Sequence, residues 1–250
     1  MRKSCSRILI LTRRNIKEIL RDPLSLVFTF ALPLVMELLF YFIFHNLTSQ
    51  FEMKYLAPGI VVFSEAFLTL FTGLLIALDR GTSFLTRLYV SPAKSHEFIF
   101  SYALAVLPVS LVQAILFFLV GGVVDPSIFG IGMLWAILMS LVTSLFFIAA
   151  GILFGSIAGE KSIGGVSSII ITGQSVLSGM WFPLEGIGGG MVALMNALPF
   201  RNATLLVQNL LLGGGDRFED VVKPLLVVLA YTVALFIAAI LAFRSKMNEK

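Results

Sequence analysis

Long runs of apolar residues alternate with short polar segments along most of this chain. Six of the runs approach or exceed the roughly 20 residues that a helix needs to cross a bilayer. We expect membrane-spanning helices at residues 24–44, 56–78, 98–124, 128–158, 164–182 and 225–243. The pattern therefore predicts an all-α integral membrane protein with six transmembrane helices.

The first 22 residues carry a different, amphipathic pattern. Basic residues such as Arg14 and Lys17 share one face of a helix, and Ile16 and Leu20 belong to another. This arrangement is typical of a helix that lies in the membrane interface and is attracted by anionic lipid head groups. An ordinary basic flank that only sets topology is the alternative. The sequence RDP, Arg21–Pro23, favours the interfacial helix because it marks a sharp boundary before the first span.

The segment 183–212 is apolar but interrupted by Pro199, Arg201 and Asn202. A seventh span here would carry Arg201 near the middle of the membrane, which is costly. We expect two short half-helices that enter the membrane from its outer side and return. Such a re-entrant hairpin must pack against the helix bundle, since irregular backbone at membrane depth is tolerated only inside protein or beside water.

Composition and charge distribution support a membrane protein with a defined orientation. Hydrophobic residues make up 58% of the chain and charged residues only 13%, a balance that a soluble domain does not show. Fourteen of the 18 lysines and arginines fall in the N-terminal segment, the loops after the second and fourth spans, and the tail. The positive-inside rule then predicts that both termini are cytoplasmic. Because the basic residues follow membrane sides, the net charge does not indicate nucleic-acid binding.

The cytoplasmic loop after the second span contains a short charged motif, DRGTSFLTRLYVSP, at Asp79–Pro92. Its apolar residues share one helical face; they are Phe84, Leu85, Leu88 and Tyr89. Thr82 or Ser83 is suited to cap such a helix, and Pro92 prevents its continuation. A solvated connector is the alternative, but a connector needs no apolar face. The motif therefore indicates a small helix that docks into a groove on a partner protein.

The motifs, in their order along the chain, resemble the permease subunit of type-2 ABC exporters over nearly the full length. The resemblance rests on these stretches: RDP (Arg21–Pro23), LAPGI (Leu56–Ile60), DRGTSFLTRLYVSP, LSGMWFPLE (Leu177–Glu185) and ALPF (Ala197–Phe200). It implies one transmembrane domain over residues 1–250. It also implies an N-terminal interfacial helix in contact with the ATPase, and re-entrant half-helices at 183–212.

The same resemblance implies a coupling helix at Gly81–Val90 that docks on a separate cytosolic ABC ATPase subunit. The residues expected to serve this coupling are Gly81, Thr82, Phe84, Leu85, Arg87, Leu88, Tyr89 and Pro92. ATP and Mg²⁺ would bind to the partner, so this chain is expected to hold no cofactor. A second permease copy, identical or different, would complete a dimer in the cell membrane. Spans one, two and five would line the transport cavity.

Polar residues within the predicted spans are candidates for the transport pathway. An ionisable group inside a membrane is a functional hypothesis by default, and Glu37 and Glu65 are such groups. Their positions predict similar depths below the outer surface, where they would face each other or a shared cavity. The alternative is a packing role, with each carboxyl protonated or paired with a hydroxyl such as Ser64 or Thr69. In span five, Gln174 and Ser178 are further pathway candidates.

Motifs for catalysis or metal binding are weak in this sequence. GSIAGEKS, Gly155–Ser162, faintly resembles a phosphate-binding loop, but Glu160 stands where that loop requires glycine, and the segment ends a membrane helix. The two histidines are too far apart for a metal site, and no hydrolase motif occurs. We therefore expect neither catalytic nor metal-binding residues. Gly151, Gly155 and Gly159 form a small-xxx-small series, which predicts close helix packing.

Two other functions compete with the exporter hypothesis. The first is a proton-coupled secondary transporter that uses Glu37 and Glu65 as a relay. Transporters of that kind usually contain internal inverted repeats, and no repeat is evident here. The second is a membrane scaffold that docks a cytosolic partner without transporting anything. A scaffold would account for the amphipathic loop but not for the intramembrane carboxyl groups. The nature of the substrate is left open by the sequence.

Overall fold

The computed structural model describes residues 2–81, 94–182, 184, 187–214 and 218–248, and within these ranges the fold is all-helical. The longer helices are α1 (Arg2–Leu20), α2 (Pro23–Phe44), α3 (Met53–Gly81), α5 (Ser95–Val124), α6 (Ile131–Ile157), α7 (Glu160–Leu177) and α10 (Lys223–Asn248). The shorter elements are η1 (Ser49–Phe51), η2 (Pro126–Ile128), α8 (Gly189–Ala197), α9 (Pro199–Leu211) and the π-helical turn η3 (Phe218–Val222).

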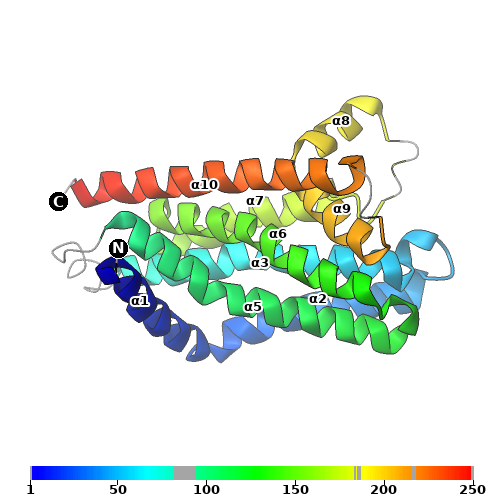
Figure 1. Ribbon diagram of the computed structural model, residues 1–250, viewed down its shortest axis with the longest axis horizontal. Coiled ribbons are helices and arrows are strands. Elements are labelled where there is room, and N and C mark those ends of the chain that lie inside the picture. The colour runs from blue at the N-terminus through cyan, green and yellow to red at the C-terminus, as the bar shows by residue number, and fades with distance from the viewer. Residues whose placement is uncertain (1, 82–93, 183, 185–186, 215–217, 249–250) are drawn as a thin grey trace.

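Helices α2, α3, α5, α6, α7 and α10 run side by side along the bundle, and both chain termini lie at the same end of it (Figure 1). Helix α1 lies at this end, whereas α8 and α9 lie at the opposite end. Four of the helices, α2, α3, α5 and α6, are long and apolar enough to cross a membrane, as is the helical segment Phe218–Ser245 that contains α10. The protein is therefore a multi-pass membrane protein with five candidate spans among its described residues.

The predicted fifth span, residues 164–182, corresponds to α7. This helix belongs to the bundle, but it is more polar than the five candidate spans, since Glu160, Lys161 and several serines and glycines belong to it. Its predicted end at Phe182 is wrong. The helix ends at Leu177 because Gly179 adopts a left-handed conformation, with φ of +74°, that a continuing helix does not permit. Phe182 lies beyond this turn.

The RDP motif separates α1 from α2 as predicted. The Asp22 side chain accepts a hydrogen bond from the Ser25 backbone N–H at 3.1 Å, and Pro23 occupies the first turn of α2. An aspartate N-cap followed by proline is a favourable helix start, because it satisfies one free N–H and needs none from the proline. The chain therefore changes direction between the amphipathic helix and the first membrane helix.

Helix α3 forms the centre of the bundle. In its most apolar stretch 78% of the residues are buried, compared with 17% in the corresponding stretches of α2 and of the segment containing α10. Helices α2, α5, α6, α7 and α9 all pack against α3. The apolar outer faces of α2 and α10 remain exposed, so they are available to lipid or to another subunit.

Glycines allow α3 and α6 to approach closely, as the small-xxx-small series predicted. A Cβ atom added at Gly151 would lie 2.6 Å from the Thr69 carbonyl oxygen, and one at Gly155 would lie 2.6 Å from the carbonyl oxygen of Gly73. No side chain fits at either position without moving the helices apart. The third glycine, Gly159, is different: it lies in open space at the N-cap of α7.

Two short helices, α8 and α9, occupy the segment in which half-helices were predicted. Leu198 separates them with extended backbone, and Pro199 begins α9. The Asn202 side chain donates hydrogen bonds to the carbonyl oxygens of Asn196 and Leu198, at 2.8 and 2.6 Å, and so fixes the corner between the helices. Helix α9 packs on α3, α6 and α10. The segment is thus anchored to the bundle.

Candidate functional site

The predicted coupling helix lies between the end of α3 and the start of α5. Of its expected contact residues, Gly81 is the last residue of α3. The others lie outside the described residues; they are Thr82, Phe84, Leu85, Arg87, Leu88, Tyr89 and Pro92. The two helix ends that flank the segment are described in full, and both are joined to the amphipathic helix α1 by polar contacts.

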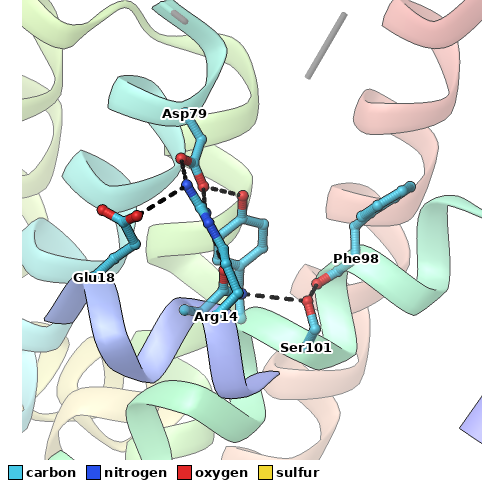
Figure 2. A network of polar contacts seen from close by, with 7 residues as sticks. Arg14, Glu18, Asp79, Phe98 and Ser101 are labelled. Carbon is cyan, nitrogen blue, oxygen red and sulfur yellow. Dashed lines mark hydrogen bonds and ion pairs between the residues drawn. The ribbon is translucent and has the colours of Figure 1, made fainter. Parts of the chain in front are cut away.

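Arg14 of α1 makes the central contact, with Asp79 near the end of α3 (Figure 2). Its two guanidinium nitrogens bind the two carboxylate oxygens, with Nη2 donating to Oδ1 at 2.6 Å. The Tyr102 hydroxyl of α5 donates to Asp79 Oδ2 at 2.6 Å. The Asp79 side chain is only 8% exposed. Bidentate, partly desolvated pairs of this kind are geometrically specific, so the contact determines how the three helices meet.

A second set of hydrogen bonds joins α1 to α5. The Asn15 side-chain amide donates to Ser101 Oγ at 3.3 Å, and Ser101 Oγ donates to the Phe98 carbonyl oxygen at 2.7 Å (Figure 2). Arg14 also contacts Glu18 at 3.6 Å on the exposed side of α1. We name Arg14, Asn15, Asp79, Ser101 and Tyr102 the α1–α3–α5 network. It connects the amphipathic helix to both helices that flank the coupling segment.

Glu97 provides a further connection at the start of α5. Its carboxylate accepts hydrogen bonds from the Ser4 hydroxyl and from the Lys94 backbone N–H, the latter at 3.0 Å, and Arg7 lies 3.4 Å away. A carboxylate in the first turn also interacts favourably with the positive end of the helix dipole. The N-terminal half of α1 is therefore held to the first turn of α5.

Arg80 completes the set of contacts at this end of the bundle. Its Nη1 donates to the carbonyl oxygens of Gly155 and Ala158, at 2.9 and 3.0 Å, and so satisfies free acceptors at the end of α6.

Burial by itself lowers the pKa of Arg14, but the hydrogen bond and charge of Asp79 outweigh it and raise the pKa above its ordinary value. Arg14 therefore keeps its positive charge over the physiological pH range.

The pathway candidates Glu37 and Glu65 are both fully buried, but they do not lie at the same depth. A Cβ added at Gly121 of α5 would be 3.2 Å from both Glu37 Oε1 and the Ala57 Cβ. Glu37 therefore lies beside Ala57, about 12 Å from Glu65 along α3 at 1.5 Å per residue. The prediction of equal depth is wrong, because α2 is shifted along its axis relative to α3, so that Glu37 lies level with Ala57 and not with Glu65.

The two carboxyl groups also differ in their partners. Glu65 Oε2 accepts a hydrogen bond from the Thr143 hydroxyl of α6 at 2.7 Å. Neither Glu37 oxygen has a hydrogen-bond partner among the described residues. The hydroxyls of Ser64 and Thr69 donate instead to backbone carbonyl groups. Glu65 is therefore paired with a hydroxyl, as the packing alternative predicted, but the hydroxyl is that of Thr143 and not of Ser64 or Thr69.

Gln174 and Ser178 lie near the end of the bundle opposite α1. The Gln174 amide donates to the Thr204 hydroxyl of α9 at 3.0 Å, which joins α7 to α9. Ser178 lines a cavity together with residues of α9 and of the turn after α2. The structure thus separates the pathway candidates: the two glutamates are buried in the bundle, Gln174 joins α7 to α9, and Ser178 lines this cavity.

A comparison with protein-family models matches residues 6–212 to the ABC-2 type transporter family. The chain belongs to this family. The matched region includes most of α1, the buried glutamates and α9, and it ends one residue after α9. No curated protein matches the chain. The protein is thus the membrane domain, or permease subunit, of an ABC-2 type transporter.

In this ABC-2 type transporter permease, the faint phosphate-loop sequence is part of the membrane bundle. Gly155–Ser162 includes the end of α6 and the start of α7, whereas a nucleotide-binding loop follows a strand. The family match likewise contains no ATPase domain. Permeases of this family generally work with separate ATPase subunits.

Sequence reasoning did not predict Asp79, Glu97 and Tyr102 as site residues of the ABC-2 permease. A signal for two of them was present. Asp79 and Glu97 flank the charged loop on either side, and Arg7 and Arg14 are seven residues apart, which places them on one face of a helix. Complementary charges at this spacing indicate a helix docked across two others. No comparable pattern identified Tyr102.

Proposed function

We propose that this chain is the permease subunit of an ATP-driven exporter, with a translocation pathway of its own and a separate cytosolic ATPase as its motor. The single observation that carries the proposal is the α1–α3–α5 network, which occurs here in a member of the ABC-2 family. It joins an amphipathic helix to both helices that flank an amphipathic loop. A mechanical input at that loop would reach three helices together.

The proposed topology has six spans, with both termini in the cytoplasm. Helix α7 would be the sixth: its 18 residues measure about 27 Å, close to the thickness of the hydrocarbon core. An even number of crossings agrees with the two termini at one end of the bundle (Figure 1) and with the excess of basic residues at that end. Helices α8 and α9 would then be re-entrant half-helices on the outer side.

The proposed mechanism uses α3 and α5 as levers. Closure of the ATPase subunits around ATP would push on the coupling helix at Gly81–Val90, and the movement would continue into the helices on either side. The Arg14–Asp79–Tyr102 contacts would make α1 move with them as one body. Such a rigid connection is what rigid-body transitions between two states require. The result would be a cavity that opens outward between two permease copies.

A second permease copy is part of this proposal. The most apolar stretches of α2 and of the segment with α10 are mostly exposed, and they carry large apolar side chains such as Phe28 and Phe42. Lipid or a partner subunit can cover such faces. An identical or a different permease would satisfy the geometry equally well, and the cavity would form where the two copies meet.

Affinity purification tests the proposed partnership. The solubilised wild-type chain is expected to bring an ABC ATPase subunit with it, whereas a variant with Leu85→Asp and Leu88→Asp is expected to lose it. Two charges on the apolar face would be buried unpaired against the ATPase, which is strongly unfavourable. The matched control is Leu47→Asp, a leucine that is 71% exposed in the turn after α2, at the other end of the bundle.

The control variant is expected to retain the ATPase at wild-type levels. Equal recovery of the ATPase with the double variant would rule out Gly81–Val90 as the docking element. Absence of any ATPase from the folded wild-type protein in mild detergent would overturn the exporter proposal and favour a proton-coupled carrier that uses Glu37 and Glu65.

The buried glutamates are expected to influence transport more than folding. Glutamine retains the size and one acceptor oxygen of glutamate, so Glu37→Gln and Glu65→Gln should change the melting temperature by no more than about 3 °C, equivalent to roughly 1 kcal/mol. ATP-driven transport by the complex in proteoliposomes should fall at least fivefold in one of them. Glu52→Gln, at a partly exposed carboxylate paired with Lys54, is the control. Wild-type export in both variants would remove the glutamates from the pathway.

A further inference from the structure

A cavity lies among the described residues at the end of the bundle opposite α1. Its volume is about 640 Å³, within the range of small-molecule binding sites. It is enclosed by the turn after α2, the turn after α7, and one face of α9. The lining residues used below are Thr48, Gln50, Tyr55, Phe182, Arg201 and Gln208. It includes one permanently charged cation and no carboxylate among the described lining residues.

Arg201 is the charged group of this cavity, and its charge is not neutralised within the described part of the chain. Its Nη1 atom is buried and has no hydrogen-bond partner there. Burial lowers the pKa of the Arg201 guanidinium below its ordinary value, because nothing described offsets the lost hydration. A guanidinium still stays protonated at physiological pH. A partly buried cation without an acceptor is costly, and an anionic ligand would remove that cost.

The position of Arg201 is determined by contacts of neighbouring residues that do not involve its guanidinium. It lies in the first turn of α9, where Pro199 begins the helix and the Asn202 amide holds the corner with α8. Gln174 of α7 donates to Thr204, one turn further along α9. The helix is therefore braced on both sides of Arg201. Preorganisation of this kind reduces the entropy lost when a ligand binds.

The remaining lining groups suit the head of an amphipathic molecule. Thr48, Tyr55 and Gln208 supply hydroxyl and amide donors, which are the groups that bind oxyanions together with arginine. Gln50 lies beside them, and its amide donates to the Gly179 carbonyl oxygen at 2.7 Å, which holds the turn after α7 against the turn after α2. Phe182 and neighbouring apolar residues line the same space. The cavity thus offers polar and apolar surfaces together.

We propose that this cavity binds an oxyanion of the phosphate class, with Arg201 as its principal ligand-binding residue. A guanidinium binds two oxygens of such a group in a fork geometry, which a single ammonium does not do. The proposal depends on the proposed function only for placing this end of the bundle at the outer membrane surface. Phospholipid head groups and free phosphate present the same chemistry, and binding measurements distinguish these two sources.

The test measures binding to the purified permease in detergent, without any ATPase, so it does not depend on the exporter proposal. The probes are a short-chain phosphatidic acid, the matched zwitterionic phosphatidylcholine, and inorganic phosphate, with dissociation constants from microscale thermophoresis. The wild type is expected to bind phosphatidic acid at least tenfold more tightly than phosphatidylcholine. Arg201→Gln is expected to weaken that binding at least tenfold, and Arg201→Lys by an intermediate factor.

Lys223→Gln is the control for a general effect of removing one positive charge from the protein. This lysine is exposed at the same end of the molecule and pairs with Glu219, so its removal should change the affinity less than twofold. A second pair of variants tests the site if Arg201→Gln does not fold. Thr48→Glu places a carboxylate in the cavity lining at an exposed position of the turn after α2, and Thr48→Gln is its neutral counterpart. Only the glutamate should abolish binding of phosphatidic acid.

Each outcome bears on the proposal. Competition by millimolar inorganic phosphate would support recognition of the oxyanion itself, and selective binding of phosphatidic acid without such competition would support a lipid head group. Equal affinity of the wild type and Arg201→Gln, or of the two Thr48 variants, would overturn the site. If the wild-type protein bound phosphatidic acid but brought no ATPase with it in the affinity purification, the exporter proposal would be contradicted and this site would remain supported.

Discussion

Replacement of Asp79 by alanine is expected to destabilise the protein more than any other single change at the α1–α3–α5 network. The side chain is 8% exposed and accepts hydrogen bonds from both Arg14 and Tyr102. Its removal leaves a partly buried guanidinium without its carboxylate, at a cost of about 3 kcal/mol. At roughly 2–4 °C per kcal/mol for a chain of this size, the melting temperature should fall by about 6–12 °C.

A double-mutant cycle isolates the Arg14–Asp79 interaction from the other consequences of the substitution. Arg14→Ala combined with Asp79→Ala should cost clearly less than the sum of the single changes, with a coupling of about 1–3 kcal/mol. Glu18→Gln is the matched control, because this carboxylate contacts Arg14 at 3.6 Å on the exposed side and should contribute less than about 0.5 kcal/mol. Additive effects of Arg14→Ala and Asp79→Ala would show that the pair does not hold the helices together.

The network variants should also separate coupling from stability. If α1 moves with α3 and α5 as one body, the folded fraction of Asp79→Ala should show ATP hydrolysis that no longer drives export in proteoliposomes. Tyr102→Phe removes one hydrogen bond to Asp79 and preserves the ion pair, so it should retain most of the coupling. Unchanged export per ATP in Asp79→Ala would contradict the role of the network as a mechanical connection.

Gly151→Ala is expected to have the second-largest effect. The added methyl group would lie 2.6 Å from the Thr69 carbonyl oxygen and 2.9 Å from the Thr72 Cβ, so α3 and α6 must separate. Overpacking of this kind costs typically 1–3 kcal/mol, and the backbone atom cannot rotate away as a side chain can. Against this, alanine favours a helix by about 0.5–1 kcal/mol over glycine. A net loss of about 1 kcal/mol should appear as a lower melting temperature.

Gly165→Ala is the matched control for this prediction. Gly165 lies inside α7, and a Cβ there meets no atom within 4 Å among the described residues. The same chemical change should therefore leave the melting temperature unchanged or slightly higher. Similar melting temperatures for the two alanine variants would indicate that the close contact of α3 and α6 does not contribute to stability.

The local pattern of the sequence predicted most of the architecture. Every predicted span corresponds to a helix, and five of the helical segments have the length and apolarity of membrane spans. The amphipathic helix, the boundary at Asp22–Pro23 and the close packing at Gly151 and Gly155 were also predicted. All of these depend on the residue pattern within a single segment of the chain. The end of α7 was not predicted, because the left-handed backbone conformation of Gly179 does not interrupt the apolar pattern from which the span was assigned.

The candidate site was less accessible from sequence. The coupling residues were assigned from the resemblance, and those from Thr82 onward lie outside the described residues, so their role remains a prediction. Glu37 and Glu65 were recognised as buried ionisable groups, but their relative depth was wrong. Depth from sequence assumes level helices, whereas side-chain packing determines how far α2 is displaced along α3.

The sequence by itself determined that this is a multi-pass helical membrane protein with an amphipathic N-terminal helix, because apolar length and residue order are enough to specify those features. Only the tertiary structure decided which charges meet. Arg14 and Asp79 are 65 positions apart, and Arg201 closes a cavity with the turns after α2 and α7. Such contacts depend on the rotation and displacement of each helix against its neighbours, which are set by packing across the whole bundle.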